Sequence, residues 1–187
     1  MNIAKIMRVL TVPPFLVILV VTVLWKTTSV FITVWDAVPV VLFLAVIPLL
    51  AYLLQPFIPY FFQKGRSGQR ALAIIVSCVG YTAGAVTGYI SGVGREIQLI
   101  YNTYLLSVIV LTLFNCFHVR VSGHACSVSG PLVFLCYYGH IAFILPCILI
   151  ACCVIWSSLT LKRHTARDLI AGASVSVLSF FIMNMIM

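Results

Sequence analysis

The chain has 187 residues, of which 63% are hydrophobic and only 7% are charged, and its net charge is +8. Soluble domains carry about 25% charged residues, so a soluble fold of this length could not bury so much apolar surface, and lipid must be the solvent for most of it. The basic residues lie in short connections between apolar segments, where membrane topology and anionic headgroups explain them better than nucleic acid does. We therefore expect membrane lipids, and no nucleic acid, as partners.

Long, continuous apolar runs predict an all-α transmembrane bundle, because a membrane-spanning chain must satisfy its backbone polar groups internally. The runs predict seven spans in a single transmembrane domain (1–187), in chain order 10–25, 37–62, 71–93, 97–117, 124–138, 141–158 and 168–187. The fifth run is short for a hydrocarbon core of about 30 Å at about 1.5 Å per residue, so six crossings are the alternative. No small-residue cleavage site follows the first run, which we therefore expect to be a span and not a cleaved signal.

Prolines and glycines predict local features of two spans. Pro48, with Pro56 and Pro59 near the end of the second span, predicts a kinked or broken helix there. The third span carries four glycines at intervals of four residues, Gly80, Gly84, Gly88 and Gly92. Such a face lets a neighbouring helix approach closely. We expect this face to pack inside one bundle, and a homo-oligomer is the alternative.

The charge distribution predicts an orientation. With seven spans, the N-terminus and the connections after spans two, four and six share one side. Nine basic residues lie on that side, Lys5, Arg8, Lys64, Arg66, Arg70, Arg120, Lys162, Arg163 and Arg167. The other side carries two, Lys26 and Arg95, together with Asp36 and Glu96. Cytoplasmic loops are enriched in Lys and Arg, so the basic side is expected to be cytoplasmic in a multi-pass protein of the cell membrane.

The seven cysteines have no metal-ligand spacing, and most fall within apolar runs. We interpret them as small buried hydrophobes, and we expect no metal site. Cys116 and Cys126 flank one connection, and a disulfide between them in an oxidising compartment is the alternative.

Three polar clusters fall on the basic side, at 64–70, 120–124 and 157–168. Each has an ordinary explanation alone, because basic loops set topology, loop histidines are solvated, and an acid such as Asp168 accepts hydrogen bonds where a helix starts. Together they indicate chemistry. Asp168 follows His164 by one helical turn, so its carboxylate can orient the imidazole. Because the clusters occupy connections of the same parity, we expect them to meet in one pocket.

The middle cluster places a second imidazole, His124, beside Ser122 and Gly123. Glycine allows an anion to approach backbone N–H groups, and the start of the next helix adds a favourable field. Guanidinium and ammonium groups from the other clusters would complete a phosphate site.

The three clusters resemble the motifs of the type 2 phosphatidic acid phosphatases, a superfamily of integral membrane lipid phosphatases. Those motifs are K-x6-R-P, P-S-G-H and S-R-x5-H-x3-D. Ser122-Gly123-His124 matches the second motif, with Val121 in place of the proline. The resemblance covers about residues 60–175.

The third motif is matched at both ends but not at its arginine. Ser157 and the pair His164 and Asp168 match it, whereas Ser158 occupies the arginine position. The family uses that arginine on the phosphate. We expect one of two other arginines to replace it, Arg163 or Arg120.

The first motif is matched loosely. Five residues separate Lys64 from Arg70 instead of six, and Ala71 replaces the proline. Arg120, two residues before the serine of the second motif, and Trp156, just before the third, resemble the compact prokaryotic branch of the family.

The resemblance implies hydrolysis of a lipid phosphate monoester or diphosphate, such as a polyprenyl phosphate or a phosphatidic-acid-like lipid, without a metal or another cofactor. His164 would attack phosphorus and form a phosphohistidine, with Asp168 orienting the ring. His124 would protonate the leaving alkoxide and then activate water. The remaining candidates would bind the phosphoryl oxygens, namely Lys64, Arg66, Arg70, Arg120, Ser122, Gly123 and Arg163.

The alternative function belongs to another class, a catalytically silent lipid-phosphate binding or transport protein on the same scaffold, and Ser158 favours it. A structural subunit is a third possibility, against which the paired histidines speak. An unrelated ion or solute transporter is disfavoured, because no span has a charged residue at its centre.

Overall fold

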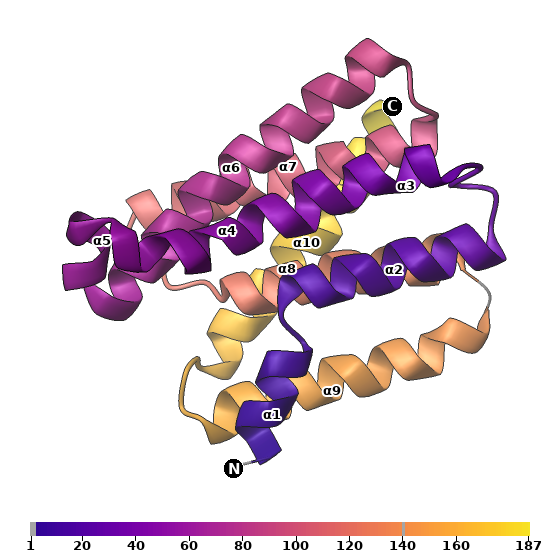
Figure 1. Cartoon of the computed structure of the whole chain (residues 1–187). Helices are drawn as coiled ribbons and strands as arrows, with labels where there is room; N and C mark the ends of the chain where they lie inside the picture. Colours follow the sequence, from indigo (N-terminus) through magenta and orange to yellow (C-terminus); the bar gives the residue numbers. More distant parts are fainter. Residues whose placement is uncertain (1–2, 140) are drawn as a thin grey trace.

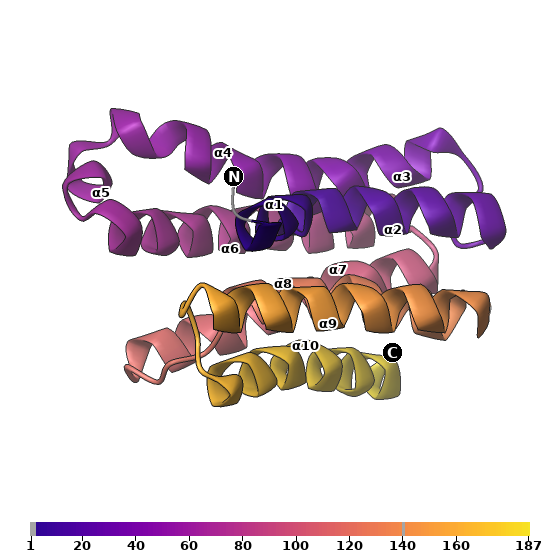
Figure 2. The same ribbon diagram turned by 90° about the horizontal axis from the view of Figure 1, so that it is seen from below.

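The computed structural model describes residues 3–139 and 141–187, and the described part folds into helices and turns without a β-strand. Figures 1 and 2 show the longer helices running side by side in one bundle, with the short α1 against α9. The helical elements are α1 (Ile3–Leu10), α2 (Pro13–Thr27), α3 (Val34–Val41), the π-helical η1 (Leu42–Val46), α4 (Ile47–Leu54), the 3-10 turn η2 (Gln55–Phe57), α5 (Pro59–Gln63), α6 (Gly65–Ser91), α7 (Arg95–Cys116), α8 (Gly123–Tyr138), the 3-10 turn η3 (Ile141–Phe143), α9 (Ile144–Thr160) and α10 (Ala166–Ile186).

Five helical segments in the described part are long and apolar enough to cross a membrane, Val34–Phe57, Gly65–Ser91, Arg95–Cys116, Ile141–Thr160 and Ala166–Ile186. They support an integral membrane protein with an all-α bundle. The other two predicted spans correspond to α2 and α8, of 15 and 16 residues. At about 1.5 Å per residue these helices fall short of a core of about 30 Å, so length supports five spans and not the predicted seven.

The first predicted span begins later than the sequence suggested. The helix is interrupted at Thr11 and Val12, and α2 starts at Pro13. Proline is favoured in the first turn of a helix, because its missing N–H would have no partner within the helix there. Residues 3–10 form the separate helix α1. A run of apolar residues conceals this break, although the two adjacent prolines mark it.

The second span is broken, as predicted. Pro48 has no N–H to donate, and its ring would clash with the carbonyl four residues earlier. The helix changes to the π-helical η1 just before this proline, and the Ile47 N–H donates to the Leu42 carbonyl, five residues earlier. At the far end, the extended backbone of Ile58 separates η2 from α5.

The glycine face of α6 packs inside the bundle. A Cβ atom added at Gly80 would lie 2.8 Å from a backbone oxygen of η1, and one added at Gly84 would lie 2.8 Å from the ring of Tyr101. Gly88 meets α7 in the same way. Gly92 differs, because it ends α6 with a φ of 63° and contacts nothing at its Cβ position. Three of the four glycines therefore serve helix packing, and the fourth is a cap.

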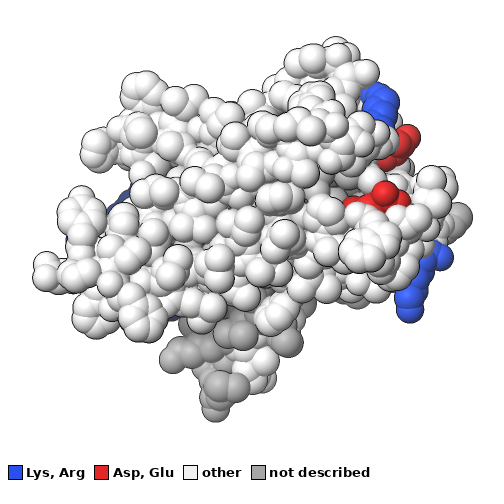
Figure 3. Space-filling model, turned by 45° about the horizontal axis from the view of Figure 1, so that its top comes forward, with Lys and Arg blue, Asp and Glu red and all other residues white. Residues whose placement is uncertain are grey.

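The two ends of the bundle carry different connections. The connections at 58–64, 117–122 and 161–165 lie at one end, which we call the basic end, and those at 28–33 and 92–94 lie at the other (Figures 1 and 2). Figure 3 shows Lys, Arg, Asp and Glu side chains gathered at the end where α2 meets α3 and α6 meets α7, and the broad middle of this face is free of them. An uncharged middle between charged ends is what a bilayer requires.

Candidate functional site

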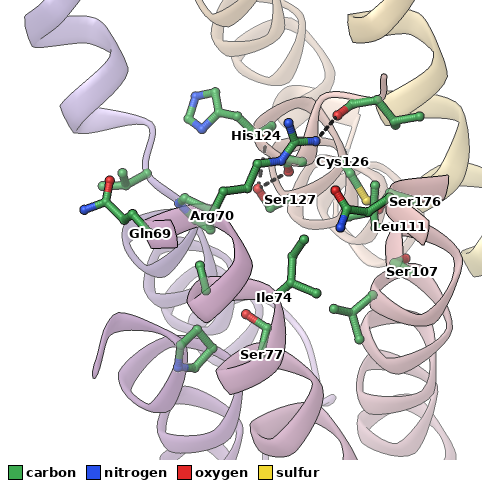
Figure 4. A pocket seen from close by; sticks show the side chains of 18 of the residues that line it. Gln69, Arg70, Ile74, Ser77, Ser107, Leu111, His124, Cys126, Ser127 and Ser176 are labelled. Atoms are coloured by element: carbon green, nitrogen blue, oxygen red, sulfur yellow. Dashed lines mark hydrogen bonds between the residues drawn. The ribbon is translucent and has the colours of Figure 1, made fainter. Parts of the chain in front are cut away.

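A cavity of about 600 Å³ opens at the basic end, and members of all three polar clusters line it. The lining includes six of the predicted residues, Arg66, Arg70, Gly123, His124, Arg163 and His164. Figure 4 shows Arg70 and His124 at the same end of the cavity, with Ile74 and Ser77 further along α6. The structure thus brings members of the three clusters together at one cavity, whereas Lys64, Arg120, Ser122 and Asp168 are outside its described lining.

Two hydrogen bonds connect the three clusters. The Arg70 guanidinium donates through Nη2 to the Val121 carbonyl at 2.9 Å, which ties the first turns of α6 to the 117–122 connection. The Ser122 N–H donates to the Asp168 carbonyl at 2.9 Å, which joins the start of α8 to the start of α10. Gly172 allows this approach, because a Cβ there would collide with the backbone of Ser122. The second and third motifs are thus held together by backbone contacts.

Ser122 and Gly123 have different roles at the start of α8. The Ser122 hydroxyl is fully buried and accepts a hydrogen bond from the Ala125 N–H at 3.2 Å, so it caps the helix. The described residues that line the cavity do not include Ser122. Gly123 does line the cavity, and a Cβ added to it would meet nothing within 4 Å. The space beside Gly123 can therefore receive a ligand, whereas the predicted contact from Ser122 is replaced by its capping role.

His124 has a partner that sequence reasoning missed. Its Nε2 lies 3.3 Å from the hydroxyl of Thr11, and that hydroxyl donates its own hydrogen to the Met7 carbonyl at 2.9 Å. With its hydrogen committed to Met7, the Thr11 oxygen can accept from Nε2–H and so orient the imidazole of His124. The break before Pro13 brings Thr11 to this position, and only the adjacent prolines signalled it.

His164 and Asp168 are close but not hydrogen-bonded through their side chains. Nδ1 of His164 lies 3.8 Å from Oδ2 of Asp168, and the side chains are 18% and 13% exposed. This distance permits electrostatic stabilisation of a charged imidazole but is too long for a hydrogen bond. The same Oδ2 accepts from the Thr165 N–H at 3.0 Å, and the Thr165 hydroxyl accepts from the Asp168 N–H, which completes a capping box. Asp168 therefore anchors the start of α10 while it faces His164.

The predicted phosphate ligands divide into two groups. Arg66, Arg70 and Arg163 line the cavity, whereas Lys64 and Arg120 are missing from the described lining. Lys64 is exposed, and its ammonium donates to the hydroxyl of Tyr60 at 2.7 Å. This hydrogen bond, with the lysine charge, lowers the pKa of Tyr60. Lys64, between α5 and α6, thus contacts Tyr60 of α5 outside the described lining of the cavity.

Ser158, at the position of the family's arginine, is completely buried in α9. No described residue forms a hydrogen bond with its hydroxyl, and the described lining of the cavity does not include it. The Arg163 N–H donates to the Ser158 carbonyl at 3.1 Å, which is a backbone contact. The expectation that Arg163 or Arg120 would place a guanidinium against Ser158 is therefore not supported by a hydrogen bond.

The seven cysteines are free thiols, with Cys116 exposed and Cys126 buried, so the alternative disulfide between these two is not formed. Comparisons with family models, curated proteins and solved structures found no match. The interpretation of the site therefore depends on its motifs and on the geometry of the cavity.

Proposed function

We propose that the protein is a membrane lipid-phosphate phosphatase, which hydrolyses a lipid phosphate monoester or diphosphate at its basic end. One observation carries this proposal: two histidines and three arginines from the three polar clusters line a single cavity in a bundle of membrane-length helices. Guanidinium groups match the geometry of phosphoryl oxygens, and histidine can act both as a nucleophile and in proton transfer.

In the proposed reaction, His164 attacks phosphorus, and the bond from phosphorus to the lipid oxygen breaks. His124 gives a ring proton to that oxygen, while the Thr11 hydroxyl beside Nε2 orients the imidazole. His124 then takes a proton from water, whose oxygen displaces His164 from phosphorus and releases inorganic phosphate. Asp168, 3.8 Å from His164, stabilises the positive charge on the imidazole during both steps.

Three arginines neutralise the charge of the phosphoryl group, namely Arg66, Arg70 and Arg163. One phosphoryl oxygen occupies the open space beside Gly123. Arg70 can bind a phosphoryl oxygen as well, because its hydrogen bond to Val121 uses one of its five N–H donors.

We also propose, from the three motifs, that the protein belongs to the type 2 phosphatidic acid phosphatase superfamily. The proposal also includes seven crossings, with α2 and α8 as short spans and the basic end in the cytoplasm.

A second candidate function is a catalytically silent lipid-phosphate binding or transport protein. Ser158 favours it, because the family's arginine is absent from that position and the serine is buried away from the described lining of the cavity.

Release of inorganic phosphate distinguishes the two candidates. The purified protein in lipid nanodiscs is offered a panel of lipid phosphates and diphosphates, with His164→Ala and His118→Asn alongside. His118 is an exposed histidine at the same end, outside the described lining, and asparagine tolerates its positive φ of 57°. We expect release by the wild type and by His118→Asn, and none by His164→Ala. No release by the wild type, together with binding that weakens in Arg70→Gln, would favour the silent protein.

A further inference from the structure

The cavity extends well beyond the histidines into the bundle. One face of α6 lines it from Arg66 through Arg70, Ile74 and Ser77 to Tyr81, and one face of α7 lines the opposite wall. Arg70 and Tyr81 are eleven residues apart, which corresponds to about 16 Å along a helix at about 1.5 Å per residue. The cavity therefore reaches about halfway through a hydrocarbon core of about 30 Å.

The lining changes character with depth. Beyond the arginines, the walls are apolar, with Ala73, Ile74, Val108 and Leu111. Hydroxyl groups line the cavity further along the helices, from Ser77 and Tyr81 on α6 and from Ser107 and Tyr104 on α7. Ser176 of α10 and the Cys126 thiol of α8 also belong to the lining. Figure 4 shows Ser77 on the α6 side, and Ser107 and Ser176 across the cavity from it. We call the part of the cavity beyond Arg70 the inner chamber.

Tyr81 and Tyr104 are the lining residues of α6 and α7 that lie furthest from the basic end. The rings of Tyr81 and Tyr104 meet edge to face, with centroids 5.4 Å apart, and Tyr104 stacks on Phe134. Both tyrosines are 7% exposed. A packed pair of this kind is a firm floor, so a ligand that enters the chamber has a maximum length.

The polar floor requires an explanation, because polar side chains at membrane depth are tolerated mainly where they face one another, a cavity or a polar ligand. Ser107 satisfies its own hydrogen through the Thr103 carbonyl at 2.7 Å, so its oxygen can act toward the chamber only as an acceptor. A purely apolar chain would suit the walls but would displace water from the hydroxyls without replacing its hydrogen bonds.

We propose that the inner chamber selects the organic group of the substrate: a single chain that carries a hydroxyl or amide about 10–16 Å from phosphorus, the helix distance from Arg70 to Ser77 and Tyr81 at about 1.5 Å per residue. This inference rests on the proposed function, which places the phosphate among Arg66, Arg70 and the histidines. The apolar walls contact the middle of the chain, and the floor hydroxyls bind its polar end.

Binding of non-hydrolysable phosphonates tests this inference. The full-length protein in nanodiscs is titrated with alkyl phosphonates and with ω-hydroxyalkyl phosphonates of the same lengths. We expect the hydroxylated chain to bind about two- to tenfold more tightly at the matching length, which is the range of a single neutral hydrogen bond. Tyr104→Phe should remove this preference while it leaves the affinity for the alkyl chain unchanged. Ser176→Ala is a second variant that should reduce the preference, and Tyr137→Phe, away from this cavity on α8, should retain it.

An alkyl chain that binds as tightly as its hydroxylated counterpart at every length would overturn the inference. The same holds if Tyr104→Phe and Ser176→Ala both keep the wild-type preference. Phosphonates are not hydrolysed, so this outcome is independent of turnover. Release of phosphate without a hydroxyl preference would support the proposed function and contradict the inference about the inner chamber. A hydroxyl preference without release of phosphate would support the inner chamber as the binding site of a catalytically silent protein.

Discussion

At the scale of single residues, the two histidines of the cavity lie in different surroundings. His164 faces a carboxylate, whereas His124 faces the hydroxyl of Thr11. We expect His164→Ala to lose turnover of every substrate, because no covalent intermediate can form. His124→Ala should lose about 10²–10⁴-fold on alkyl phosphates and much less on an activated aryl phosphate, whose leaving group needs little protonation. Measurement of kcat/KM for both substrates checks this, and an equal loss of His124→Ala on both would show that His124 is not the acid.

Adjacent serines in α9 give a matched pair for stability. The buried Ser158 hydroxyl has no partner among the described residues, whereas the equally buried Ser157 donates to the Val154 carbonyl at 3.1 Å. An unpaired buried hydroxyl costs free energy, so Ser158→Ala should stabilise the protein by about 1 kcal/mol. Ser157→Ala should be neutral or destabilising. Thermal unfolding in one detergent compares them, and a lower Tm for Ser158→Ala than for Ser157→Ala would contradict the expectation.

At the scale of elements, the contact between α6 and its neighbours depends on Gly84. A Cβ there would lie 2.8 Å from the ring of Tyr101 and 3.0 Å from the Cβ of Phe43. Gly84→Ala should therefore destabilise the bundle by about 1–3 kcal/mol, as overpacking does. Val86 lies on the same helix and is half exposed, so Val86→Ala is the control and should change the Tm little. Equal Tm values for the two variants would show that the α6 face tolerates a side chain.

Most of the long helices could be predicted from the sequence, because six of the seven apolar runs each fall on one helical segment, whereas the second run divides into several elements and α1 was not predicted. The break before Pro13 and the cap at Gly92 could not be separated from their runs by hydrophobicity alone. Six of the ten site residues named from the sequence line the cavity, because their clusters lie at the same end of the bundle. Other contacts join segments that are far apart in the chain, and no local sequence pattern reveals them. Examples are the hydrogen bond from Arg70 to Val121, the contact of Thr11 with His124 and the place of Tyr104 in the cavity wall.

At the scale of the whole molecule, the bundle combines an apolar middle with a polar interior. The middle of the outer face in Figure 3 is uncharged, as contact with lipid requires, while the cavity is lined by arginines at the basic end and by hydroxyls further along the helices. Polar groups enclosed in this way avoid the hydrocarbon. A phosphorylated lipid could therefore place its charged group at the membrane surface and its organic group inside the protein.

The orientation of the bundle decides which compartment supplies this lipid and receives the phosphate. With seven crossings, nine basic residues lie on one side against two on the other, and this count predicts that the basic end faces the cytoplasm. Cysteines introduced at the exposed positions Ser29 and Ser67, at opposite ends, test the orientation with a thiol reagent that does not cross membranes. We expect Ser29→Cys to be labelled in intact cells, and Ser67→Cys only after the cells are permeabilised, with labelling measured relative to the unsubstituted protein and its seven natural thiols. If five of the basic residues serve phosphate binding, the count falls to four against two, which still favours the same orientation. The opposite labelling pattern would place the cavity on the outer face, so that charges selected for phosphate, not for topology, dominate the sequence signal.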